Sequence, residues 1–100
     1  MSYRVVFTEA ADADINSIIE FIALDSPIRA YRFVDELISR IIDLLGQFPL
    51  SGTFYHDVRF MMFDNYTVVY DVDESNQTVY VYLITERHRE WKAVLSGRRE

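Results

Sequence analysis

The stretch that decides the fold is Thr8–Leu45, which reads TEAADADINSIIEFIALDSPIRAYRFVDELISRIIDLL. Its apolar residues recur at steps of three and four, which is the spacing of one face of an α-helix. Asp25-Ser26-Pro27 interrupts this pattern, because proline disfavours a helical residue before it yet suits the first turn of a new helix. The stretch therefore predicts two antiparallel helices, at residues 9–24 and 27–45, joined by a short turn.

Residues at the ends of the two helices support these limits. Thr8 and Ser26 carry hydroxyls that can accept a hydrogen bond from a free N–H of the first helical turn. Gly46 is expected to end the second helix in a left-handed turn. Negative charges near the start of the first helix suit the helix dipole, and they belong to Glu9, Asp12 and Asp14.

Two amphipathic helices leave apolar surface that needs another layer, and strands elsewhere in the chain can supply it. Runs of β-branched and aromatic residues predict strands at residues 3–7, 58–63, 66–72 and 78–85. Residues 49–57 are expected to form a loop, and a helical pattern returns from residue 87 to Leu95, ending at Gly97. The prediction is one α+β domain, residues 1–100, with the order β-α-α-β-β-β-(α) and a helical hairpin on a mostly antiparallel sheet of about four strands.

The run at residues 78–85 is the strongest strand signal, because it is apolar on both of its faces. Alternation along a strand assigns its side chains to two faces: Val79, Val81 and Leu83 to one, and Tyr80, Tyr82 and Ile84 to the other. This pattern predicts a central strand covered on both sides. The helical hairpin is one cover, and the C-terminal segment or a partner protein is the other.

The composition excludes several classes of site. The chain has no cysteine, so it has no disulfide, zinc–thiolate site or cysteine nucleophile. His56 beside Asp57 supplies too few ligands for a metal site, and no motif calls for a cofactor. The chain shows neither a basic–apolar leader nor an apolar run of the roughly 20 residues that span a bilayer. A cytoplasmic protein without a membrane segment is therefore expected.

The net charge of −6 is distributed unevenly. Residues 1–86 carry 5 basic and 14 acidic side chains, whereas residues 87–100 carry 5 basic and 2 acidic ones. Phosphate binding needs clustered cations, so the acidic body is expected to repel nucleic acid. Only the C-terminal segment offers a basic surface.

Several short segments, taken in order, resemble the ParE/RelE toxin superfamily of bacterial type II toxin–antitoxin systems, and its ParE branch more than its RelE branch. They are Tyr3-Arg4-Val5-Val6-Phe7-Thr8; Asp25-Ser26-Pro27 with Ala30 and Phe33; Phe48-Pro49 with Ser51-Gly52; Asn65-Tyr66 before Val68-Val69-Tyr70; and Arg89-Glu90-Trp91. Relatives of the ParE type poison DNA gyrase and are held inactive by an antitoxin whose C-terminal segment wraps the toxin. The resemblance thus implies a toxin that targets gyrase and forms a hetero-oligomer with a ParD-like antitoxin.

The resemblance and the charge pattern together suggest where the two partners bind. The target is expected to contact the basic C-terminal segment, at Arg87, Arg89, Trp91, Lys92, Arg98 and Arg99. The antitoxin is expected to lie across the hairpin and the sheet, at Tyr31, Val34, Leu37, Met61, Tyr80 and Tyr82. Removing residues 87–100 is expected to abolish toxicity and to keep the fold. The alternative for this segment is a solvated helix end.

The RelE branch implies a different activity, that of a ribosome-dependent mRNA endonuclease. Such enzymes use basic residues on the middle strands, an arginine after the last strand and a C-terminal tyrosine. The middle-strand positions read Val58, Phe60 and Thr67 here, and the tyrosine position reads Ala93 or, at best, the nearby Trp91. The residues that remain as catalytic candidates are Arg87, His88 and Arg89.

A third reading is an inactive relative that only binds an antitoxin. It is motivated by departures from the ParE pattern: many members carry an arginine where this chain has Thr67, and a histidine where it has Glu86. A gyrase inhibitor without catalytic residues of its own remains the preferred reading.

Overall fold

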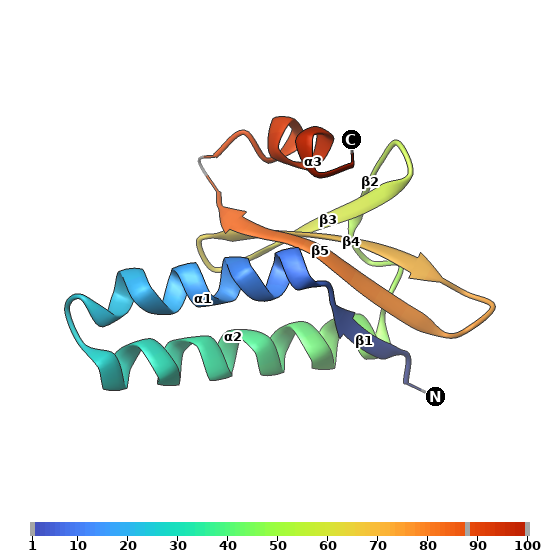
Figure 1. Ribbon diagram of the computed structural model, residues 1–100. Coiled ribbons are helices and arrows are strands. Elements are labelled where there is room, and N and C mark those ends of the chain that lie inside the picture. Colours follow the sequence, from blue (N-terminus) through green and yellow to red (C-terminus); the bar gives the residue numbers. More distant parts are fainter. Residues whose placement is uncertain (1, 88, 100) are drawn as a thin grey trace.

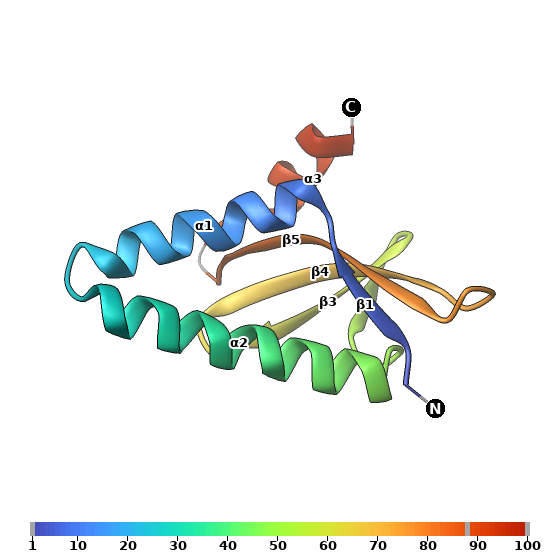
Figure 2. The same ribbon diagram turned by 60° about the horizontal axis from the view of Figure 1, so that its bottom comes forward.

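The computed structural model describes residues 2–87 and 89–99. Two helices form a hairpin on one face of a sheet, and a third helix lies on the opposite face (Figure 1; Figure 2). The predicted α+β fold is therefore confirmed. Its elements are β1 (Arg4–Phe7), α1 (Glu9–Ala23), α2 (Pro27–Gln47), β2 (Thr53–Tyr55), β3 (Val58–Phe63), β4 (Tyr66–Asp73), β5 (Thr78–Glu86) and α3 (Trp91–Arg99).

The sheet has five strands in the order β1-β5-β4-β3-β2, rather than about four. β1 pairs with β5 in parallel, and the other neighbours are antiparallel. The additional strand, β2, lies within the residues that were expected to form a loop. It has three residues, too few to show a periodicity, and it exists through pairing with β3 across a tight turn at His56, whose φ is 54°.

The predicted caps of both hairpin helices are confirmed. The Thr8 hydroxyl accepts a hydrogen bond from the Ala11 N–H at 3.2 Å, and the Ser26 hydroxyl accepts one from the Arg29 N–H at 3.3 Å. The Thr8 hydroxyl also donates to the Val81 carbonyl at 3.1 Å, which ties the start of α1 to β5. The Thr8 side chain therefore both caps α1 and bonds to the sheet, and so fixes the connection between β1 and the helical hairpin.

Gly46 does not end α2 in a left-handed turn as predicted, because α2 continues through it to Gln47. The start of the chain crosses the helix here, and the Tyr3 N–H donates to the Gly46 carbonyl at 2.7 Å. A Cβ atom on Gly46 would lie 3.2 Å from the Tyr3 carbonyl oxygen. The glycine therefore permits a close approach between chain segments rather than a special backbone conformation.

The sheet has a core on each face, and a β-bulge in β5 determines which residues belong to which. Val69 pairs with Leu83 and Tyr70 with Val81, so Tyr82 is the extra residue. Leu83 consequently joins the core beneath α3, while Ile84 faces the hairpin together with Val79 and Val81. The prediction of strict alternation was wrong beyond this point. The prediction that β5 is covered on both faces is confirmed, and α3 is the second cover.

Tyr70 is fully buried between the hairpin and the sheet, and its hydroxyl accepts a hydrogen bond from the Gly52 N–H at 2.8 Å. Burial raises the pKa of the Tyr70 phenol. The folded protein then holds this proton more tightly than the unfolded chain. The resulting contribution of Tyr70 to the free energy of unfolding is therefore complete below about pH 10, and it is lost as pH rises through the pKa of the folded state. Urea midpoints are therefore expected to fall above pH 10, and to fall less steeply in Tyr70→Phe; parallel profiles would contradict this role of Tyr70.

Candidate functional site

Residues 91–99, within the basic C-terminal segment, form α3, which packs on the sheet through its apolar side. Leu95 is 5% exposed and lies in one cluster with Val58, Val69 and Leu83. α3 continues through Gly97, which was expected to end it, as far as Arg99. Removing residues 87–100 would uncover this cluster, so the expectation that the truncated chain keeps its fold is revised. Point substitutions are the better probe of function.

Arg98 anchors α3 to the rest of the molecule. Its guanidinium pairs with both carboxylate oxygens of Asp14 in α1, at 2.6 and 2.9 Å, and also donates to the Tyr82 carbonyl at 2.8 Å. Asp14 accepts a further bond from the Ile84 N–H at 2.9 Å, beside the point where β1 stops covering β5. Arg98 is thus engaged within the chain, and its role as a target-binding cation stays a prediction.

Trp91 and Lys92 form an aromatic–cationic group with the β2–β3 hairpin. The Trp91 ring lies 4.8 Å from that of Phe60 and 5.2 Å from that of Tyr55, measured between centroids. The Lys92 ammonium lies 4.5 Å from the centroid of the Tyr55 ring, a cation–π contact. Trp91 is half-buried and packs against the cluster beneath α3, so it helps to hold this helix on the sheet.

Arg87 and Arg89 are exposed in the connection between β5 and α3. With Lys92 they give three predicted target-binding cations at one end of α3. His88 lies outside the described residues, and so does the side chain of Arg99; the predictions for both remain predictions.

The positions that should be basic in a RelE-type nuclease carry no cation and are largely inside the molecule. Val58 and Thr67 are 2% and 1% exposed, and Phe60 packs against Trp91. Ala93, at the tyrosine position, is an exposed residue of α3. Of the described catalytic candidates, only Arg87 and Arg89 are available to hold a phosphate.

Two of the residues predicted to contact the antitoxin are buried, so the prediction that they lie on its binding surface is corrected. Val34 and Leu37 are 3% and 1% exposed, because they belong to the core between α2 and the sheet. Tyr31 is 60% exposed and lies at the end of the hairpin, which projects beyond the sheet (Figure 1). The hairpin tip, defined here as Tyr31 and its exposed apolar neighbours, also contains Phe21, Leu24 and Ile28. Periodicity could not identify this tip, since the length of sheet beneath the hairpin decides what stays uncovered.

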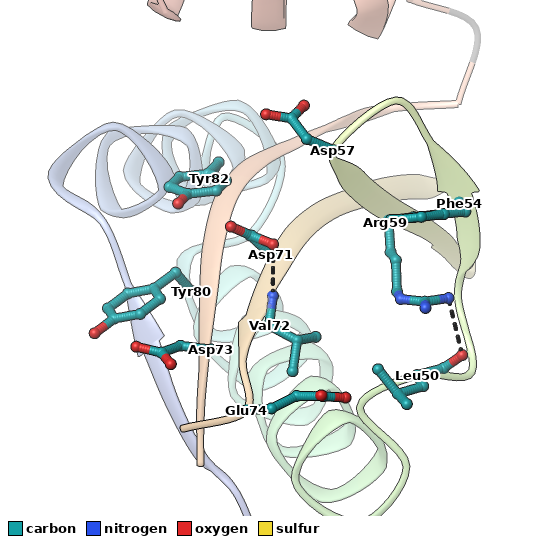
Figure 3. A pocket seen from close by; sticks show the side chains of 10 residues that line it. All are labelled: Leu50, Phe54, Asp57, Arg59, Asp71, Val72, Asp73, Glu74, Tyr80 and Tyr82. Carbon is teal, nitrogen blue, oxygen red and sulfur yellow. Dashed lines mark hydrogen bonds between the residues drawn. The ribbon is translucent and has the colours of Figure 1, made fainter. Parts of the chain in front are cut away.

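Met61 lines an apolar groove of about 420 Å³ between the end of α2 and β3. Phe48 and Met62, which are 59% and 42% exposed, form its rim. Tyr80 and Tyr82 instead line a larger hollow elsewhere on the sheet, among carboxylates (Figure 3). The six predicted antitoxin contacts therefore do not form one continuous surface.

The described residues contain no group of three or more His, Asp or Glu side chains arranged to hold a metal ion. Within the same residues, no helix is both long and apolar enough to cross a membrane.

Comparison with known proteins places this fold and segment order in a family. Residues 5–91 match the model of the ParE toxin of the type II toxin–antitoxin system parDE. The fold is similar to a chain of the chromosomal ParDE system from P. aeruginosa (TM-score 0.71, 17% identity, covering 85% of this chain and 96% of that chain). It is also similar to a chain of the RelBE2 complex from Mycobacterium tuberculosis (TM-score 0.68, 17% identity, covering 89% of this chain and 95% of that chain). A chain of the E. coli RelBE complex has the same fold (TM-score 0.61, 18% identity, covering 88% of this chain and 100% of that chain).

No curated protein sequence matches the chain. The solved structures share its fold at low sequence identity, and they include toxins named for both branches of the superfamily. The family model, in contrast, covers most of the sequence, from β1 to the first residue of α3. The chain therefore belongs to the ParE toxin family of type II toxin–antitoxin systems.

Proposed function

We propose that this chain poisons DNA gyrase through Arg87, Arg89 and Lys92, and that a cognate antitoxin neutralises it by forming a hetero-oligomer. The observation that carries the proposal is the position of these three cations. They are exposed around the start of α3, on a domain whose first 86 residues are strongly acidic. A long-lived contact with an acidic surface of a target would use such a localised positive group, because complementary potentials steer association and fix orientation.

The charge of the remaining surface supports gyrase over messenger RNA as the target. Cleavage of RNA needs cations around the scissile phosphate and a group that activates the 2′-hydroxyl. The hollow on the sheet is instead lined by the carboxylates of Asp57, Asp71, Asp73 and Glu74. These charges would repel a phosphate backbone.

The antitoxin is proposed to cover the hairpin tip and the apolar groove beside Met61. Solved structures with this fold include toxin–antitoxin complexes, which supports a protein partner of this kind. The hairpin tip exposes four large apolar side chains, of which Leu24 is 86% and Ile28 is 73% exposed. Such surfaces suit an amphipathic helix that places its apolar residues in grooves.

The direct test is a cleavage assay in which purified protein is incubated with gyrase, ATP and supercoiled plasmid. Linear, gyrase-linked DNA is expected to accumulate with the wild-type chain. The double variant Arg87→Ala/Arg89→Ala is expected to need about tenfold more protein for the same effect, since each lost interfacial charge weakens binding by roughly 0.7 kcal/mol. The readout is the amount of linear DNA against toxin concentration.

The matched control is Arg29→Ala/Arg32→Ala, which removes the same charge from the exposed surface of α2. This control is expected to behave as wild type. Equal loss in both double variants would show a nonspecific charge effect and contradict the proposed contact. A folded protein that produces no linear DNA would argue against gyrase as the target, and cleavage of ribosome-bound messenger RNA would then be assayed.

A further inference from the structure

The sheet opens into two diverging hairpins at one end, and the space between them is a hollow that we call the fork. The β3–β4 ladder ends at the pair Arg59–Tyr70, whereas β4 continues to Asp73 alongside β5. The β2–β3 hairpin bends away from the β4–β5 hairpin at this end (Figure 1). The resulting hollow has a volume of about 550 Å³ and is bounded on its far side by Leu50 and Phe54 (Figure 3).

β4 presents its backbone edge to the fork at Val72. In an antiparallel ladder, alternate residues turn their N–H and C=O groups to the same neighbouring strand, so Val72 faces the side on which Tyr70 pairs with Arg59. The Val72 N–H instead donates to the carboxylate of the adjacent Asp71 at 2.8 Å (Figure 3). The N–H at this edge is thus bonded to a neighbouring side chain and not to another strand. Such a strand edge is a position where an extended segment can add to a sheet.

The charge of the fork is strongly negative. Its lining includes four carboxylates, which are Asp57, Asp71, Asp73 and Glu74. Asp73 accepts hydrogen bonds from the Ser75 hydroxyl and the Asn76 side-chain amide, both at 2.7 Å, and these bonds lower the pKa of its carboxyl. Asp73 therefore stays ionised at neutral pH.

The cation that lines the fork is held against one wall. Arg59 donates to the carbonyls of Leu50 at 3.2 Å and Gly52 at 3.1 Å, and its guanidinium lies 4.6 Å from the centroid of the Phe54 ring. A second aromatic ring, that of Tyr80, lies on the opposite wall beside Asp73 (Figure 3). The walls thus combine carboxylates with aromatic faces, which is the environment that favours a lysine or arginine side chain.

We propose that the fork binds an extended segment of a partner protein that carries lysine or arginine at alternate positions. The segment would add a strand along the β4 edge at Val72, with its backbone replacing Asp71 as the partner of the Val72 N–H. Alternate side chains of a strand point to one face, so its cations would lie together among Asp71, Asp73 and Glu74. This surface is separate from the C-terminal cations proposed to contact gyrase, and the inference does not depend on that proposal.

The probe is an acetylated and amidated hexapeptide that alternates lysine with threonine, titrated into the full chain at low ionic strength and followed by amide chemical shifts. Saturable binding is expected, with the largest shifts at residues 71–74. A glutamate–threonine hexapeptide is expected not to bind. A lysine–threonine hexapeptide with N-methyl groups on alternate backbone nitrogens is expected to bind more weakly, because it keeps the charge but cannot complete the strand pairing.

The variant is Asp71→Asn/Glu74→Gln, in which the side-chain carbonyl oxygen of the introduced asparagine can still accept from the Val72 N–H and preserve the local structure. Its affinity for the lysine peptide is expected to fall about fivefold, in line with the loss of two partly exposed charge pairs. The control is Asp35→Asn/Glu36→Gln, which removes the same charge from the exposed face of α2 and is expected to keep wild-type affinity.

Three results would overturn the proposal. One is the absence of saturable binding of the lysine peptide to the folded wild-type chain. Another is an equal loss of affinity in the two double variants, which would mean that the peptide responds to net charge alone. The third is a set of shifts centred away from residues 71–74.

Discussion

Replacing Gly52 by alanine is expected to lower the free energy of unfolding by about 3 kcal/mol. A Cβ atom at this position would lie 2.4 Å from the Tyr70 hydroxyl oxygen and 2.9 Å from the Phe60 carbonyl oxygen. Neither group can move easily, since Tyr70 is fully buried and Phe60 is paired within the sheet. Displacing Tyr70 would also break its hydrogen bond with the Gly52 N–H. Stability is to be measured by urea denaturation at pH 7.

Gly97→Ala is the matched control, because a Cβ atom there would meet nothing within 4 Å. It lies inside α3, where alanine favours the helix over glycine, so this variant is expected to gain slightly in stability. In Gly52→Ala/Tyr70→Phe the nearest clashing atom is absent, and the second substitution should cost less than it does alone. Equal stability of Gly52→Ala and wild type would contradict the close packing described at this loop.

Replacing Asp14 by alanine is expected to cost about 2 kcal/mol and to loosen α3. The side chain of Asp14 is 15% exposed and that of its partner Arg98 is 28% exposed, so solvent screens this pair only in part. Its loss would leave the Arg98 guanidinium and the Ile84 N–H without their partner in α1. Faster amide hydrogen exchange is expected in residues 91–99, together with a lower urea midpoint.

The control for this pair is Asp25→Ala, which removes an ion pair with Arg29 whose side chains are 82% and 73% exposed. That variant is expected to change stability by less than about 0.5 kcal/mol. If Asp14→Ala left exchange in α3 unchanged, the contact with Arg98 would not be what holds the helix in place. Under the proposed function, Asp14→Ala would also weaken gyrase poisoning. Loosening of α3 would move Lys92, one of the three proposed contact residues, away from Tyr55.

Features that depend on neighbours along the chain were predictable. The two hairpin helices, their caps at Thr8 and Ser26, and the strands β1, β3, β4 and β5 were expected from spacing and residue type, and all are present. These signals act over three or four residues, within one helical turn or one strand. The order of the same segments was also enough to indicate the ParE/RelE superfamily, which the family model confirms.

Candidate sites were less predictable. A residue of a given type either contacts the rest of the chain or is exposed to a partner, and only its neighbours in the folded structure decide between these two roles. Arg98 and Arg87 are both basic residues of the C-terminal segment, yet Arg98 is paired within the chain and Arg87 is exposed. Val34 and Tyr31 are both apolar or aromatic residues of α2, yet Val34 is in the core and Tyr31 lies at the hairpin tip. The acidic fork could not be located, since it depends on where the β3–β4 pairing stops.

The sequence by itself determined the class of fold, the hairpin with its caps, the acidic body and the basic C-terminal segment, since each follows from local periodicity, residue type or charge. The tertiary structure decided which of these residues contact one another and which remain exposed. Arg98 meets Asp14 across 84 positions of the chain, Gly52 lies against Tyr70, and a bulge at Tyr82 changes the face to which Leu83 belongs. Such contacts exist only after the sheet has formed, because residues far apart in sequence are brought together by strand pairing and not by any preference that the residues carry alone.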